Sequence, residues 1–298
     1  MEDLKMKRVL SFIIVTFFLC SLSSASNAFA DTKTLIITKD DLLSADATQF
    51  SLYFNIGGAH MNITRSDDED TIVKAVVTYT STISEPTLTT TSYDGNFTAK
   101  FSSEYEWEYS WPITIQEWEI TIGSYNIDTD VSMACGGVMA DIDLGGLPLR
   151  KCTLSLGGVD MDIDFSTTTT RQLEKLKISC GGALLSMSNI GNTDFKKFEI
   201  NGGGNVVDLD FKGAYVSEQH DVDIITAGGV QTIAVPSDAG EQVQITSIAS
   251  PVVVQGNGWN KEIRPLFKHF ITNDYDAQNV KIDIDMIAVG SLVTVIRN

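Results

Sequence analysis

Hydrophobic and polar residues alternate in short runs along much of the chain, and many of these runs meet at a pair of glycines. In residues 154–165, LSLGGVDMDIDF, apolar side chains occupy alternate positions on both sides of Gly157 and Gly158. Alternation with a period of two is typical of a β-strand with one buried and one solvated face. Glycine permits a sharp bend where a Cβ atom would clash or where φ must be positive. The unit therefore predicts two strands joined at a glycine corner.

This unit recurs in five consecutive copies. The first glycine of each pair is Gly136, Gly157, Gly181, Gly203 or Gly228. The spacings are 21, 24, 22 and 25 residues, and less regular copies lie at 54–65 and 286–297. Self-similarity with a period of about 20 to 50 residues is typical of solenoids, in which each repeat buries its apolar face against the next.

Two all-β architectures fit this repeat. We favour a parallel β-solenoid, a β-helix-like stack, over residues 121–258, because residues of one type recur at one position and can stack, as Val138 over Val159. An antiparallel sandwich of hairpins is the alternative, since paired glycines between strands are also a hairpin signal. Residues 31–120 are expected to form an N-terminal β module that caps the stack.

A C-terminal cap is expected at 259–298. Within it, residues 260–270, NKEIRPLFKHF, predict a short helix with Leu266, Phe267 and Phe270 on its apolar side, followed by final strands. Both caps would cover the strand edges that a solenoid otherwise exposes.

The first thirty residues have the pattern of a signal peptide rather than of folded structure. A charged start precedes the apolar run VLSFIIVTFFLCSL, and small residues at Ala28 and Ala30 predict cleavage after Ala30. No later stretch is long and apolar enough to span a bilayer. We therefore expect an exported protein that is extracellular, cell-surface or periplasmic.

Charge narrows the range of partners. Without residues 1–30 the chain has 18 basic and 37 acidic residues, which gives a net charge of −19. So negative a surface argues against nucleic acid and anionic lipid as partners, and it is compatible with a cationic partner.

Three cysteines follow the leader: Cys135, Cys152 and Cys180. Cys135 and Cys180 occupy the same position in two repeats that a third repeat separates. In a stack they would lie two rungs apart, about 9.5 Å, which exceeds the roughly 7 Å between Cα atoms that a disulfide spans. We predict no Cys135–Cys180 bridge and interpret both residues as small buried hydrophobes.

The segments IQEWEITIG and VSMACGGVMADIDLGGLPLRKCTLSLGGVDMDIDF resemble the exported "toast rack" putative-adhesin family, which is related to the C-terminal domain of cell-wall-active antibiotic response proteins. The preceding segment FSLYFNIGGAHMNITRSDDEDTIVKAVVTYTSTISEPTLT resembles the N-terminal module of that family. Together these resemblances cover most of residues 45–250. They imply a parallel β-helix-like stack at the cell envelope, and they bring no catalytic residues to carry over.

Aspartates recur on the polar side of the second strand of the unit. The pairs are Asp141/Asp143, Asp162/Asp164 and Asp208/Asp210. Stacking would align them in short columns, and carboxylate oxygens attract Ca²⁺. Because Ser186 and Ser188 interrupt the columns in the third copy, we interpret the aspartates as an outward polar face. We predict no metal site and no cofactor.

One short segment is aromatic at every second position: Tyr105, Trp107, Tyr109 and Trp111. This row is the best candidate ligand surface, because aromatic rings can stack on sugar rings. Burial in the core of the N-terminal module is the alternative, since aromatic side chains gain much from burial. Exposure of the two tryptophans would favour sugar binding, and their burial would favour a scaffold.

No catalytic motif is present, and the three histidines are scattered at His60, His220 and His269. We expect a non-catalytic envelope scaffold or adhesion-type binding module of unknown partner, carbohydrate being one candidate. A polysaccharide-binding or polysaccharide-cleaving β-helix protein is the alternative. The linkers recur at one place in the repeat, so a binding face is expected around Pro148, Thr168 and Asn192.

Overall fold

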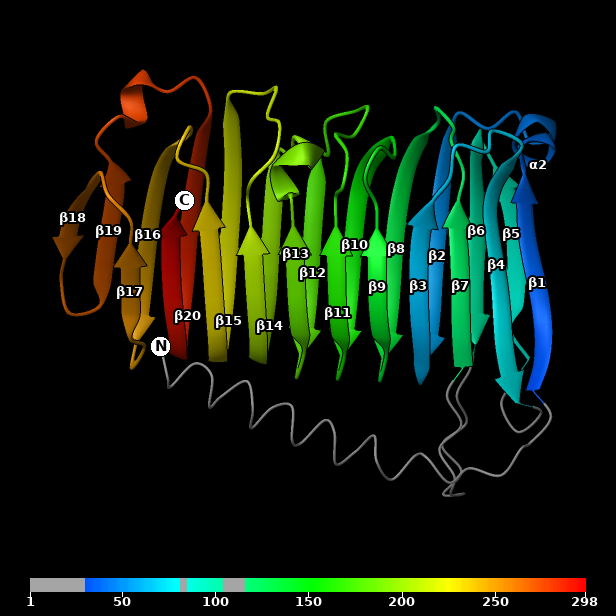
Figure 1. Ribbon diagram of the computed structural model, residues 1–298, viewed down its shortest axis with the longest axis horizontal. Coiled ribbons are helices and arrows are strands. Elements are labelled where there is room, and N and C mark those ends of the chain that lie inside the picture. Colours follow the sequence, from blue (N-terminus) through cyan, green and yellow to red (C-terminus); the bar gives the residue numbers. More distant parts are fainter. Residues whose placement is uncertain (1–29, 81–84, 104–115) are drawn as a thin grey trace.

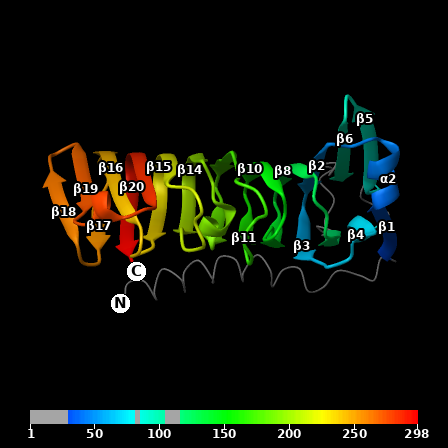
Figure 2. The ribbon, with the colours of Figure 1, turned by 90° about the horizontal axis from the view of Figure 1, so that it is seen from above.

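The computed structural model describes residues 30–80, 85–103 and 116–298. Within them the chain forms a long stack of β-strands, with the rungs side by side along the long axis (Figure 1). Seen from above, the strands lie in two rows (Figure 2). We name them the first layer, which holds the strand before each glycine corner, and the second layer, which holds the strand after it.

Most rungs consist of one strand in each layer. The first-layer strands are β2 (Gln49–Gly57), β8 (Asp128–Gly136), β10 (Leu149–Gly157) and β12 (Lys175–Gly181). Their second-layer partners are β3 (Ala59–Arg65), β9 (Met139–Asp143), β11 (Asp160–Asp164) and β13 (Leu184–Ser188). Three longer strands continue through the corner into both layers: β14 (Lys197–Asp210), β15 (Gln219–Val235) and β20 (Lys281–Arg297).

Neighbouring rungs pair in parallel, with glycine opposite glycine. Gly157 of β10 lies opposite Gly136 on one side and Gly181 on the other. The expected stack is therefore parallel over these rungs, and the alternative of antiparallel hairpins at the glycine pairs is wrong. The fifth copy differs from the sequence alignment by one residue, because Ala227, not Gly228, lies opposite Gly203.

A positive φ explains the second glycine of each corner. Gly137, Gly158 and Gly182 have φ values of +65°, +60° and +63°, in the left-handed region that favours glycine. A Cβ atom added at Gly157 or Gly158 would meet no atom within 4 Å. At this corner the requirement is therefore conformational and not steric.

The order of rungs departs from the order of the chain at both ends. β2 lies between β6 (Asn96–Ser103) and β8, and β3 lies between β7 (Gln116–Ile122) and β9. At the other end, β20 pairs with β15 on one side and with β16 (Gly240–Ile248) and β17 (Val252–Gln255) on the other. The degenerate repeat at 286–297 is thus an interior rung.

Antiparallel strands complete both ends of the stack. Near the N-terminus, β1 (Ala30–Thr38) pairs with β4 (Thr71–Thr80), β4 pairs with β7, and β5 (Thr87–Tyr93) pairs with β6. The one α-helix of the described residues, α2 (Lys39–Ser44), follows β1. Near the C-terminus, β16 pairs with β19 (Phe267–Thr272), which pairs in turn with β18 (Trp259–Ile263).

The helix predicted at 260–270 is wrong, because this segment forms the hairpin of β18 and β19. In β19, buried Phe270 and Thr272 alternate with half-buried His269 and Ile271, which is the pattern of a strand. As strand β19, the segment satisfies the backbone groups at the edge of β16, which a helix would leave unpaired.

The core lies between the two layers and consists of columns of like residues. In the first layer, Leu154, Ile178, Ile200, Ile224 and Met286 lie opposite one another in register and are all buried. Leu156 lies between Cys135 and Cys180, and all three described cysteines are free and buried. The prediction that Cys135 and Cys180 do not form a disulfide is confirmed.

Candidate functional site

The aromatic row predicted as a ligand surface lies at Tyr105, Trp107, Tyr109 and Trp111, which are outside the described residues. Whether these rings form core or surface therefore stays a prediction. A different tryptophan, Trp118 of β7, is fully buried and donates its indole N–H to Gln116 Oε1 at 2.8 Å.

The aspartates of the second layer face outward, as expected, but several of them also join consecutive rungs. Asp162 is exposed and lies opposite Asp141 on one side and Ser186 on the other. Asp143 accepts the Ser166 hydroxyl at 2.6 Å, and Asp164 accepts the Ser188 hydroxyl at 2.7 Å. Across the described parts of the chain, no group of three or more His, Cys, Asp or Glu side chains is placed to hold a metal ion.

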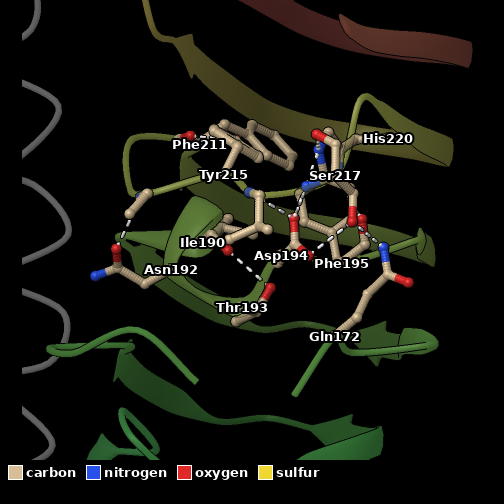
Figure 3. A network of polar contacts seen from close by, with 12 residues as sticks. Gln172, Ile190, Asn192, Thr193, Asp194, Phe195, Phe211, Tyr215, Ser217 and His220 are labelled. Carbon is tan, nitrogen blue, oxygen red and sulfur yellow. Dashed lines mark hydrogen bonds and ion pairs between the residues drawn. The ribbon is translucent and has the colours of Figure 1, made fainter. Parts of the chain in front are cut away.

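A denser polar network lies at the linker side, around Asp194 (Figure 3). Asp194 follows the short 3₁₀ helix Ile190–Thr193 and has a φ of +46°. Its Oδ1 accepts the backbone N–H groups of Val216 and Ser217 at 3.0 and 2.8 Å, and its Oδ2 accepts the Ser217 hydroxyl at 2.7 Å. This buried carboxylate therefore ties the linker after β13 to the linker after β14.

Ser217, Asp194 and His220 have the composition of a hydrolase triad but not its connectivity. In a triad the serine hydroxyl bonds to the histidine, which the carboxylate orients from its other side. Here the Ser217 hydroxyl donates to Asp194. Both ring nitrogens of the fully buried His220 face backbone carbonyls, those of Phe195 and Ser217. Within this network His220 is therefore not placed to activate Ser217, and we assign the network a structural role.

The linker residues expected to form a binding face are largely committed to the fold. Pro148 is buried, whereas Thr168 is exposed. Asn192 donates to the Phe165 carbonyl at 2.8 Å and accepts the N–H of Ala214 at 3.0 Å, so it links three linkers. Pro148 and Asn192 therefore contribute to the fold, and the binding face expected on the linker side around these residues stays a prediction.

The outer face of the first layer is hollowed over its C-terminal rungs. Asp221 and Asp223 of β15 lie in register with Asp283 and Asp285 of β20. The depression is bordered by Lys197 of β14 on one side and by Gln242 and Gln244 of β16 on the other. We call the four carboxylates the aspartate grid.

The aspartate grid is unevenly neutralised. Lys197 forms an ion pair with Asp223 at 3.0 Å, and Asp283 accepts hydrogen bonds from Gln219 and Tyr275, each at 2.7 Å. Among the described residues, no basic side chain lies within 4.0 Å of Asp221 or Asp285. Partial burial, together with the charges of Asp223, Asp283 and Asp221, raises the pKa of Asp285 above its usual value.

Below the aspartate grid, toward the glycine corner, the same outer face is apolar. Ile225 and Ile287 lie side by side and are 50% and 46% exposed. Val289 lies beside Ile248, which is 51% exposed. We call these four residues the apolar corner. Leu266 and Ile263, on the adjacent β18–β19 hairpin, are also exposed.

The sequence contains a signal for the apolar corner, which is a break in the alternation of apolar and polar residues. The first-layer position that carries Ile225 and Ile287 carries Ala134, Ser155, Ser179 and Asn201 in the preceding rungs. Two consecutive isoleucines at 224–225 and a Met–Ile pair at 286–287 break the alternation. The second residue of each apolar pair faces solvent.

Fold and surfaces together define a class of protein, a repeat-built β-stack whose described polar side chains lie in rows along its outer faces. The chain belongs to the toast_rack family, because residues 25–188, more than half of it, match the family described as the N-terminal domain of toast_rack, DUF2154. No curated protein matches the chain. Within the described residues, no helix has the length and apolar character needed to cross a membrane.

Two solved structures are similar to this chain. A "putative cell adhesion protein" from Clostridium sporogenes has 15% sequence identity and a TM-score of 0.48, with 90% of this chain and 100% of that chain covered. A "putative adhesin" from Bacteroides fragilis has 12% identity and a TM-score of 0.36, with coverages of 90% and 97%.

Proposed function

We propose that this protein is an exported, non-catalytic scaffold or binding module of the cell envelope, which acts by presenting the outer faces of a rigid stack. One observation carries the proposal. The described polar side chains are arranged in rows along flat faces or are used to join rungs, and they do not converge on a nucleophile with its base. Serine, histidine and aspartate meet only in a network whose connectivity cannot activate the serine.

The construction of the stack supports a presenting role. A repeat protein in which each rung contacts its neighbours gains stiffness along its axis, and its faces extend with each added rung. Parallel pairing is continuous from β6 to β16 in the first layer, and the outermost strands are paired antiparallel. The predicted signal peptide at 1–30 adds the export step, after which such faces would be available to an envelope partner.

Fractionation and turnover assays test the proposal together. The full chain, with an epitope tag inserted in the linker near exposed Thr168, should be recovered from the envelope or extracellular fraction of its bacterial host. A variant lacking residues 1–30 should stay in the cytoplasm. Purified residues 31–298 should release no reducing ends from host envelope polysaccharide. Cytoplasmic recovery of the full chain, or release of reducing ends, would overturn the proposal.

Substitutions in the aromatic row distinguish a scaffold protein from a carbohydrate-binding protein. If the row is core, the Trp107→Ala/Trp111→Ala variant should be destabilised, because replacing a buried tryptophan by alanine costs about 3–5 kcal/mol, and any loss of sedimentation with insoluble envelope polysaccharide should accompany a loss of its circular dichroism signal. Selective loss of sedimentation in the variant, with unchanged circular dichroism, would instead support the polysaccharide-binding alternative.

A further inference from the structure

We propose that the aspartate grid and the apolar corner form one docking surface for a partner protein, which binds through a segment that places Lys or Arg side chains beside apolar ones. This inference rests on the proposed function, because it names the partner chemistry of a presenting module. It goes further because it assigns the binding surface to the outer face of the first layer, over the C-terminal rungs.

The first argument is the placement of apolar residues where the fold does not require them. The inner face of β15 and β20 already packs the core through Ile224 and Met286. Ile225 and Ile287 point to the opposite side, at a position where three preceding rungs have Ser155, Ser179 and Asn201. Contiguous exposed apolar residues bordered by polar ones are typical of interaction sites.

The second argument is charge complementarity. Asp221 and Asp285 have no basic partner within 4.0 Å among the described residues, although Asp223 has Lys197. Four aspartates in two register rows concentrate negative charge, and partial burial together with the neighbouring carboxylates raises the pKa of Asp285. Cationic side chains of a partner would relieve the repulsion among these carboxylates.

Spacing sets what the partner must carry. Along a strand, alternate residues are about 6.7 Å apart, and neighbouring strands are about 4.8 Å apart. Asp221, Asp223 and Ile225 therefore follow one another at about 6.7 Å on β15. Apolar and basic side chains three or four positions apart on an amphipathic helix are separated by a similar distance. The backbones of β15 and β20 are paired on both sides, so docking uses side chains and not strand addition.

The binding experiment uses residues 31–298 and an 18-residue helical peptide with a lysine stripe beside a leucine stripe. Its controls are the same peptide with glutamate for lysine and a scrambled peptide of equal composition. Fluorescence anisotropy should show saturable binding of the lysine–leucine peptide only. The Ile225→Thr/Ile287→Thr variant, which keeps β-branched side chains, should bind it at least about tenfold more weakly. Asp223→Asn/Asp285→Asn should weaken binding and reduce its dependence on salt.

Matched variants on the second layer test whether peptide binding depends on this surface or only on the negative net charge of the protein. Asp160→Asn/Asp162→Asn removes two exposed carboxylates of the single strand β11, and Val206→Thr changes a residue that is 45% exposed. Both variants should bind the peptide like the unchanged protein. If the Asp160/Asp162 variant loses as much affinity as the Asp223/Asp285 variant, or if the scrambled peptide binds equally, the proposed surface is wrong.

Cross-linking in the host identifies the occupant. A photoreactive amino acid at exposed Thr246, beside Ile287, should cross-link to a basic, apolar segment of another protein. The adduct should be lost when Ile225→Thr/Ile287→Thr is added. An adduct with a second copy of this chain, or no adduct, would overturn the proposal. Retained envelope association in that variant would refute this surface but leave the proposed function standing, whereas polysaccharide cleavage would refute the function itself.

Discussion

The middle of the stack and its C-terminal end differ in how neighbouring rungs are joined. In the middle, rungs follow one another in chain order, and short side chains join each rung to the next, as Asp143 joins Ser166. At the C-terminal end, β20 is inserted between strands that precede it in the chain, and its last residues include a buried ion pair with β16. Arg297 Nε lies 3.1 Å from Glu241 Oε2, with Arg297 only 11% exposed and Glu241 fully buried. Local repetition builds the first region, whereas pairing between strands far apart in the chain builds the second.

Breaking the buried pair should have the largest effect. At about pH 9, above the raised pKa of Glu241, Arg297→Met leaves the Glu241 carboxylate buried without its cation, and removing one partner of a buried ion pair costs about 3–5 kcal/mol. Urea denaturation of residues 31–298 would measure the change in the free energy of unfolding. Arg264→Met, which removes an exposed ion pair with Glu262, serves as the control and should change it by at most about 1 kcal/mol. Equal effects of the two substitutions would refute the special role of the C-terminal pair.

The Arg297–Glu241 pair also predicts that the free energy of unfolding depends on pH. Burial raises the pKa of Glu241 to about 8, against the opposing effect of Arg297. The folded state therefore holds this proton more tightly than the unfolded state, whose carboxyl titrates near pH 4.5. Its contribution to stability is fully present below about pH 4.5 and is lost as pH rises through about 8. Glu241→Gln should flatten the dependence of the melting temperature on pH over this window, and an unchanged profile would contradict the assignment.

In the middle of the stack, Asp194 should matter more than the exposed aspartates. Asp194→Ala leaves the part-buried N–H groups of Val216 and Ser217 without their acceptor, at a cost of about 1–3 kcal/mol. Asp162→Ala, on the outer face of β11, should change the free energy of unfolding by less than about 0.5 kcal/mol. Thermal denaturation monitored by circular dichroism distinguishes them, and similar melting temperatures would show that the linkers do not depend on Asp194.

The smallest effect is expected at the corners, where two adjacent glycines differ. Gly158→Ala forces a side chain into φ +60° and should cost about 1 kcal/mol. Gly157→Ala meets no neighbouring atom and no positive φ, so it should be nearly neutral. Chemical denaturation of the two single variants checks this pair. A larger cost at Gly157 would show that the corner is limited by space after all.

Local patterns made the architecture predictable. Alternation in each copy indicated strands, and the recurrence of Val138 and Val159 at one position indicated a parallel stack. The register of the fifth copy and the place of β20 were not predictable, because Ala227 replaces a glycine and because pairing order is not encoded in a repeat. The apolar residues at 266, 267 and 270 fit a helix and a hairpin equally well, so only the need of β16 for a partner decides between them.

The candidate surface was harder to predict than the fold. Ile225 follows Ile224 directly, and from sequence either could face the core. The aspartates of β15 and β20 gave no sign of facing one another, since Asp221 and Asp283 are 62 positions apart in the sequence. The grid exists only because the chain returns to insert β20.

The insertion of β20 also sets an order of events in time. β15 cannot acquire its final neighbour until residues 281–297 have arrived, although β16, β17 and the β18–β19 hairpin are synthesised earlier. Until then the native pairing leaves one edge of β15 without a neighbouring strand, because β20 lies between β15 and β16. The Arg297–Glu241 pair likewise forms only when β20 is in place. The C-terminal end of the stack, and with it the aspartate grid, therefore assembles as one late, long-range event of high contact order.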